Sequence, residues 1–317
     1  MQIDKDTQIL IDERLKNNAP ALESFTPQEL RALRAKMAET PLELRVDISD
    51  VQDLSVKGTL GDIPIRKYFN SSTSDPKHKT SPLIIYFHGG GFVMGDLESH
   101  DLVCRHLCKE AKATIIAVDY KLAPEHKFPA PVIDTKDAIT KIFERAEEFN
   151  FDPNKVILCG DSAGGTLATV GTIMSRDNVI PKVHGQILVY PWVDMTMCRR
   201  SMDIDLEGMI LNKKTIKYFA DHYLNNTQEQ VDWRASPLLT ADLSNLPPTY
   251  IYGAGLDPLV DEGDAYKRRL LSFGNEVHYR LFPGQMHAFL SNSLQLPTSL
   301  ICIKEMGKAA QTIFSKL

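Results

Sequence analysis

The sequence has no long apolar run and no block of like charges. It is charged from its first residues, and no later window approaches the roughly 18 consecutive apolar residues of a membrane-spanning helix. Its 36 basic and 41 acidic residues are interspersed and give a net charge of -5, which does not favour nucleic acid or an anionic membrane. We therefore expect a soluble, cytoplasmic protein that acts on a small, uncharged molecule.

Cysteine is also scarce. The five cysteines are scattered and odd in number, which argues against a disulfide framework. Cys104 and Cys108 lie one helical turn apart and could be two metal ligands, but no second Cys or His pair completes a site. We interpret both as buried free thiols on a helix face. The sequence predicts neither a metal nor a cofactor.

The first part of the chain has a helical pattern. Leu30, Leu33 and Met37 recur at three- and four-residue steps, and Thr26-Pro27-Gln28-Glu29 is a typical helix start. These helices, within residues 1–46, could form a plain packing arm or cover a pocket. We interpret them as an N-terminal cap segment.

Strand and helix patterns alternate after residue 47. An edge hairpin is expected at 47–69, an exposed loop at 70–81 and a helical insertion at 194–228, which we interpret as a second cap segment rather than edge packing. The core is then residues 47–193 and 229–317. This order predicts an α/β fold with a mostly parallel central sheet and helices on both faces. Strands are expected at 83–87, 114–118, 156–159, 185–190, 249–253 and 276–282, and helices at 98–112, 132–149, 163–174, 212–224, 262–273 and 299–314.

The segment Gly160-Asp161-Ser162-Ala163-Gly164 joins a strand to a helix. It matches G-x-S-x-G, a turn that exposes a serine hydroxyl at the carboxyl end of a strand. The glycines let strand and helix pass closely. Alone, the motif could occur by chance or be a phosphate cradle, but neither G-K-[ST] nor G-x-G-x-x-G is present here.

A nucleophilic serine needs a histidine base, which in this arrangement follows the acid in the chain. His287 is the only one of the nine histidines expected in a loop after the last strand. His184 leads into a strand, His222 lies in the insertion and His278 lies within a strand. The five others precede Ser162: His78, His88, His100, His106 and His126.

Three aspartates compete for the role of acid. Asp257 follows a strand at the required edge of the sheet, and Pro258 fixes the turn. Asp261 is better explained as a helix N-cap, and Asp242 would lie at the wrong end of the strand. We therefore favour Asp257.

A second glycine-rich turn, His88-Gly89-Gly90-Gly91, follows the strand expected at 83–87. An acyl-transfer intermediate needs converging N–H donors for its oxyanion. Gly90 and Gly91 can supply two of them beside the N–H of Ala163. We expect His88 and Gly89 to support this oxyanion loop.

Several segments together resemble the hormone-sensitive-lipase family of α/β-hydrolases, the bacterial family IV esterases. The narrower resemblance is to the bacterial acetyl esterase branch. The resemblance to the family implies Ser162 as nucleophile, Asp257 and His287 as its partners, oxyanion donors at Gly90, Gly91 and Ala163, and a helical cap. Ala288 replaces the glycine that many members carry after the histidine, and we expect no loss of activity from it. The matching segments are 88–92, 119–125, 160–165, 257–263 and 287–289.

The sequence thus predicts a serine carboxylesterase for short-chain acyl esters. An amidase, arylformamidase or lactonase with the same triad is an alternative, because the residues that select the leaving group are not fixed by the motifs. A non-catalytic small-molecule receptor on this scaffold, as in plant hormone receptors that resemble the family, is a further alternative, but His287 argues against it. The natural substrate and the oligomeric state, with a homodimer one option, remain open.

Overall fold

The computed structural model describes residues 2–38, 44–71 and 80–317. The described residues form an eight-stranded sheet in the order β1-β2-β4-β3-β5-β6-β7-β8. β1 and β2 form an antiparallel hairpin, β2 pairs antiparallel with β4, and every later pairing is parallel. The strands are β1 (Asp50–Gly58), β2 (Gly61–Phe69), β3 (Ser81–Phe87), β4 (Thr114–Val118), β5 (Phe151–Asp161), β6 (Gly185–Val189), β7 (Thr249–Leu256) and β8 (Val277–Met286).

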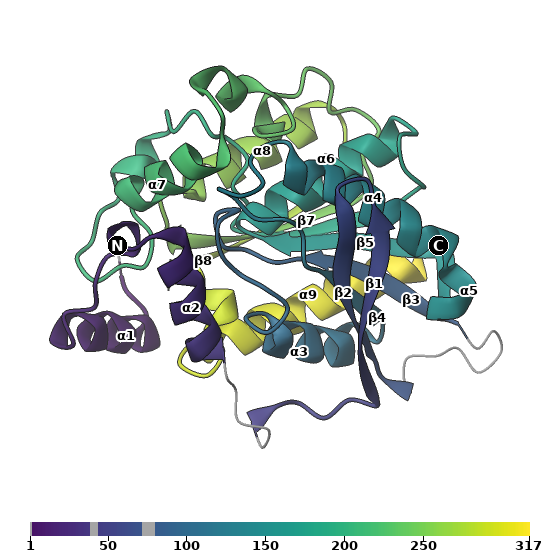
Figure 1. Ribbon diagram of the computed structural model, residues 1–317, viewed down its shortest axis with the longest axis horizontal. Coiled ribbons are helices and arrows are strands. Elements are labelled where there is room, and N and C mark those ends of the chain that lie inside the picture. The colour runs from purple at the N-terminus through teal and green to yellow at the C-terminus, as the bar shows by residue number, and fades with distance from the viewer. Residues whose placement is uncertain (1, 39–43, 72–79) are drawn as a thin grey trace.

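Helices cover both faces of this sheet, as predicted (Figure 1). α3 (Asp101–Ala111) and α9 (Thr298–Ser315) pack together on one face, over one apolar cluster. α4 (Ala130–Glu144), α6 (Ala163–Arg176) and α8 (Val260–Ser272) lie on the other face, over a second cluster. The short helix α5 (Ala146–Phe149) follows α4, and 3₁₀ turns lie at Leu22–Ser24, Arg200–Asp203, Thr227–Val231, Pro237–Leu239 and Phe289–Ser291.

The predicted elements are present, but several boundaries were wrong. The helix expected at 98–112 begins only at Asp101, and the one expected at 132–149 is divided into α4 and α5. β8 runs to Met286 instead of ending at 282, because its last residue pairs with Leu256 of β7 beyond a register shift that accommodates Pro283. Of the loop expected at 70–81, residues 72–79 lie outside the described residues, and Ser81 already belongs to β3.

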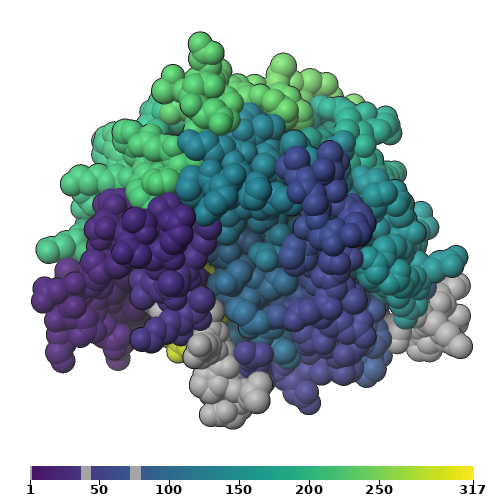
Figure 2. All heavy atoms as spheres, viewed as in Figure 1, coloured from purple at the N-terminus to yellow at the C-terminus, as the bar shows by residue number. Residues whose placement is uncertain are grey.

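The two N-terminal helices lie beside the insertion, near the carboxyl ends of the parallel strands. α1 (Lys5–Lys16), α2 (Pro27–Ala38) and α7 (Lys213–Tyr223) are grouped at the left of Figure 1, and Figure 2 shows the purple N-terminal residues against the green ones. Hydrogen bonds join them: Arg14 Nε donates to Gly208 O (2.9 Å) and Thr215 Oγ1 donates to Glu23 Oε2 (2.7 Å).

The start of α2 is the capping box that its sequence predicts. Thr26 N–H donates to the Glu29 carboxylate (2.8 Å), and Glu29 N–H donates to Thr26 Oγ1 (3.3 Å). None of the helices in the described ranges has the length and apolar character needed to cross a membrane.

Candidate active site

Ser162 lies in the turn between β5 and α6. Its backbone adopts φ 53° and ψ -121°, outside the regions that L-residues favour. The turn is tight: a Cβ on Gly160 would overlap the backbone of Gly164, and one on Gly164 would overlap the Phe87 carbonyl. Ala163 is the first residue of α6, so its N–H has no acceptor within the helix. The local geometry is therefore the strained turn that the motif predicted.

The structure brings the three predicted site residues together from separate strand ends. Ser162 Oγ lies 2.9 Å from His287 Nε2, and His287 Nδ1 lies 2.7 Å from Asp257 Oδ2. Asp257 directly follows β7, and its other oxygen accepts the N–H of Leu259 (2.8 Å). All three side chains are buried. Such a chain of contacts can transfer a proton from the serine to the histidine while the carboxylate holds the ring in one orientation.

The backbone directly after His287 is left-handed, at the position where the family resemblance implied a glycine. Ala288 has φ 63°, a left-handed conformation that glycine adopts without steric cost. Asn292 Nδ2 donates to the Ala288 carbonyl (2.7 Å) and helps to hold this turn. The ring of Tyr190 lies against His287, with centroids 4.5 Å apart. The imidazole of His287 is thus held by contacts on several sides.

The interpretation of Asp261 as a helix N-cap was wrong. α8 begins at Val260, so Asp261 already lies in the first turn, and the capping residue Leu259 has no side-chain hydrogen bond. Asp261 Oδ2 instead accepts the N–H of Ser201 (2.9 Å), which belongs to the insertion. The helix starts earlier than expected because Val260 N–H already bonds the carbonyl of Asp257. Asp261 therefore fastens the insertion to the core.

The glycine-rich turn after β3 lies beside Ser162. Gly90 and Gly91 have φ values of 125° and 62°, and in the described part of the chain neither N–H donates to a protein acceptor. A side chain on Gly91 would meet the ring of Phe219 from α7. His88 contacts the turn through Nδ1, 2.8 Å from the Gly89 carbonyl. The structure therefore places two free N–H groups in this turn.

Asp161, the variable residue before the serine, has a role that the motif did not reveal. Its buried carboxylate accepts hydrogen bonds from Tyr86 Oη (2.7 Å) and Gly89 N–H (3.0 Å) and lies 3.3 Å from His100 Nε2. Burial by itself would raise the pKa of Asp161, but the contacts with His100 and Tyr86 outweigh it and lower the pKa. The charged carboxylate thus connects the two glycine-rich turns.

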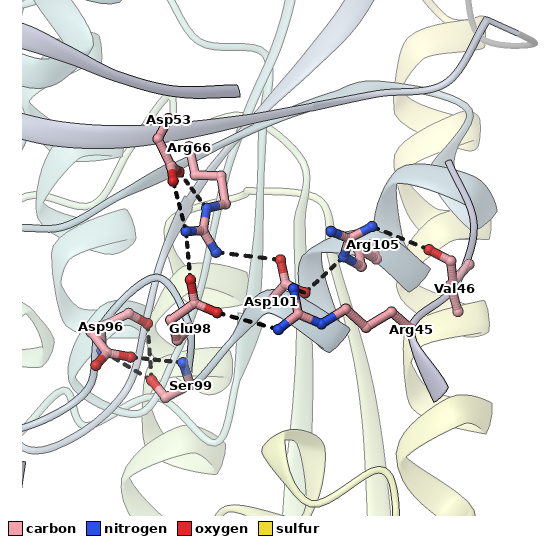
Figure 3. Close-up of polar contacts among 9 residues, drawn as sticks. All are labelled: Arg45, Val46, Asp53, Arg66, Asp96, Glu98, Ser99, Asp101 and Arg105. Carbon is pink, nitrogen blue, oxygen red and sulfur yellow. Dashed lines mark hydrogen bonds and ion pairs between the residues drawn. The ribbon is translucent and has the colours of Figure 1, made fainter. Parts of the chain in front are cut away.

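A second network holds the segment that continues from the glycine-rich turn (Figure 3). Arg66 of β2 donates to Asp53 (2.5 Å) and to Glu98 Oε1 (2.6 Å), and it approaches Asp101 (3.5 Å). Glu98 and Asp101 lie directly before and at the start of α3. No motif indicates this network, because it joins an edge hairpin to a loop more than 30 positions away in the sequence. It anchors residues 96–101 to the sheet.

A cavity of about 330 Å³ opens onto Ser162 and His287. Its remaining walls come mainly from the N-terminal helices, the glycine-rich turn, residues 210–219 of the insertion and residues 288–295. No group of three or more His, Cys, Asp or Glu side chains in the described residues could hold a metal ion. Residues that line the cavity include Leu10, Arg14, Leu30, Leu33, Arg34, Gly90, Gly91, Met94, Asp161, Leu211 and Phe219.

The fold and the geometry around Ser162 are those of an α/β-hydrolase. A family model described as alpha/beta hydrolase fold matches residues 84–291. The chain belongs to this family, which confirms the fold and the family resemblance predicted from the motifs.

Known relatives are similar over most of the chain. The carboxylic ester hydrolase LipN of Mycobacterium tuberculosis is 40% identical over 76% of this chain, and the match spans 65% of LipN, slightly less than two thirds. The ethyl acetate hydrolase of Pseudomonas putida is 34% identical over 83% of this chain and 80% of its own length. A solved ester-hydrolase from the metagenome of Lake Arreo superposes with a TM-score of 0.92 at 33% identity, covering 99% of this chain and all (100%) of that one.

Proposed function

We propose that this chain, a carboxylic ester hydrolase, cleaves short-chain acyl esters through Ser162, His287 and Asp257. The observation that carries the proposal is the continuous chain of contacts from Ser162 Oγ through His287 to Asp257, at 2.9 and 2.7 Å. A serine hydroxyl is a weak nucleophile at neutral pH, and this arrangement supplies its base and orients it.

In the proposed mechanism, Ser162 Oγ attacks the ester carbonyl as His287 Nε2 takes its proton. The resulting imidazolium is stabilised by Asp257 and returns the proton to the leaving alcohol, which departs and leaves an acyl-enzyme. Water, deprotonated by His287, then attacks the acyl group. The carboxylic acid leaves and Ser162 regains its proton.

The N–H groups of Gly90, Gly91 and Ala163 are the proposed oxyanion donors. The two glycine N–H groups have no protein acceptor in the described residues, and that of Ala163 opens a helix. Donors held in place in this way stabilise the charge that develops on the carbonyl oxygen, and the loss of one typically costs about 10²–10³ in rate. We assign His88 and Gly89 to the support of this turn.

We also propose that residues 1–46 and 194–228 form a cap on a core made of 47–193 and 229–317. The cavity supports this division, because Leu30 comes from the first segment and Phe219 from the second. Its volume of about 330 Å³ and its mostly apolar lining favour a small acyl group.

Replacement of the serine tests the proposed mechanism. We expect Ser162→Ala to lower kcat for p-nitrophenyl acetate by at least about 10³-fold, because the attacking oxygen is lost. Ser315→Ala, which removes an exposed hydroxyl at the end of α9, is the matched control and should retain the parental rate. If Ser162→Ala hydrolysed the ester as fast as the parent, the mechanism would be wrong.

A further inference from the structure

Arg34 is a cation in the cavity with no partner among the residues that the structure describes. It lies on α2, is half-buried and lines the same cavity as Ser162 and His287. Within the described ranges, its guanidinium makes no hydrogen bond or ion pair. A guanidinium has five N–H donors and stays charged at physiological pH, so those donors are available to a bound molecule.

The neighbouring arginines Arg31 and Arg14 donate to protein acceptors, whereas Arg34 does not within the described residues. Arg31, one turn earlier on α2, donates to Val93 O (2.7 Å), Ala123 O (2.6 Å) and both oxygens of Glu125. Arg14, which also lines the cavity, uses its Nε–H on a backbone carbonyl. Arg31 thus fastens α2 to the core, whereas Arg34 on the same helix is directed to the cavity.

The other charges around the cavity do not neutralise Arg34. Among the described lining residues Asp161 is the only carboxylate, and it already accepts hydrogen bonds from Tyr86 and Gly89 and lies 3.3 Å from His100 Nε2. Burial lowers the pKa of Arg34, while Asp161 and Asp96 act on it through space in the opposite sense. The described lining of the cavity thus contains two arginines and one carboxylate, in a chain whose net charge is -5. Taking an unpaired cation partly out of water costs free energy, which a bound anion would recover.

We propose that Arg34 binds a carboxylate carried by the ester substrate. The substrates would be esters with a second, anionic group, such as half-esters of dicarboxylic acids or acylated aromatic acids. A monoanionic carboxylate fits one guanidinium fork, whereas the nearby Asp161 would repel a dianion more strongly. The proposal rests on the esterase function proposed above and replaces the uncharged substrate that the composition suggested.

Two matched pairs of esters test whether the anion lies on the acyl or on the alcohol side. The acyl pair is p-nitrophenyl hydrogen glutarate and p-nitrophenyl pentanoate, and the alcohol pair is 4-acetoxybenzoate and 4-acetoxybenzamide. For at least one pair, the ratio of kcat/KM for the anionic ester to that for the neutral ester should fall about 10- to 100-fold in Arg34→Met. Arg34→Lys, which keeps the charge without the fork, should restore part of the ratio.

Lys36→Met is the matched control, because it removes one positive charge from an exposed position of the same helix. It should keep the parental ratio. The proposal is overturned if Arg34→Met leaves both ratios unchanged, or if Lys36→Met lowers them equally.

A binding measurement separates this proposal from the esterase function. Amide analogues of the two anionic esters are titrated by calorimetry into Ser162→Ala and into the double variant with Arg34→Met. We expect at least one analogue to bind Ser162→Ala at least about 10-fold more tightly than it binds the double variant. If such binding occurs but no ester is hydrolysed by the parent, the proposed function fails and the anion site stands. If the parent hydrolyses the esters but the analogues bind both variants equally, the proposed anion site fails and the esterase function stands.

Discussion

At the scale of single residues, Ser162 keeps a conformation that it would not adopt in isolation. Backbone strain of this kind costs about 1–3 kcal/mol and persists only where the surroundings enforce it. Ser162 N–H donates to Val189 O (2.9 Å), and its carbonyl accepts from Trp192 N–H (3.1 Å) and Thr166 N–H (3.2 Å). β6, the chain that follows it and α6 thereby fix the serine from three sides.

Glu262 gives a prediction at the same scale. Its buried carboxyl accepts the N–H groups of Val193 (2.5 Å) and Asp194 (2.8 Å), and burial raises its pKa well above the ordinary 4.5. The folded protein therefore binds more protons here than the unfolded chain, and this group's contribution to stability decreases as pH rises above 4.5. We expect the free energy of unfolding of Glu262→Gln, relative to the parent, to increase with pH above that value. Urea unfolding at several pH values measures it, and a difference independent of pH would contradict the account.

At the scale of elements, the close approach of α6 to β3 and β5 depends on glycine. A Cβ on Gly164 would overlap the Phe87 carbonyl of β3, which is backbone and cannot turn aside. We expect Gly164→Ala to destabilise the fold by about 1–3 kcal/mol and to displace Ser162, with a loss of esterase activity. Thermal unfolding and kcat for p-nitrophenyl acetate measure the two effects.

Gly263 provides the control for this substitution. It lies in α8, and an added Cβ would meet no atom within 4 Å. Gly263→Ala should leave the fold intact or stabilise it by up to about 1 kcal/mol, because alanine favours helix. Equal destabilisation by both substitutions would show that the close packing at Gly164 is not the cause.

At the scale of the whole molecule, the N-terminal helices are fastened to the core by polar contacts. Asp4 N–H donates to Gly284 O (3.1 Å), and Arg31 pairs with Glu125 at 3.0 and 2.7 Å. The Asp4 contact holds the start of α1, and the contacts of Arg31, including its hydrogen bonds to carbonyls of the core, hold α2 over the cavity.

We expect Arg31→Met to increase amide hydrogen exchange in residues 27–36 at neutral pH. The Arg31 side-chain hydrogen bond lowers the pKa of Glu125 to about 2. The stabilising effect of the pair is therefore complete above pH 4.5, the ordinary pKa of a glutamate carboxyl. It is lost only as the pH falls through about 2. Parental α2 should thus stay protected in mild acid. Lys36→Met is the control, and unchanged exchange in Arg31→Met would contradict the role of this pair.

Much of this molecule could be predicted from the sequence because its site is built from local patterns at strand ends. Ser162, Asp257 and His287 each follow a recognisable strand, and a parallel sheet brings such ends together. The predicted end of β8 was wrong because the true end depends on the register with β7, which no local sequence pattern indicates. The contacts of Arg66 and the proposed role of Arg34 were missed because both depend on where a side chain points after distant segments have packed.

Covalent labelling of Ser162 tests the central claim most directly. The parent protein is treated with diethyl p-nitrophenyl phosphate, its residual activity on p-nitrophenyl acetate is followed, and the labelled peptide is located by mass spectrometry. We predict that the parent carries a single diethylphosphoryl group, on Ser162, and that the labelled fraction equals the fraction of activity lost. Ser162→Ala should carry no label at any position. Loss of activity with the label on a different residue would contradict the assignment of Ser162 as the nucleophile.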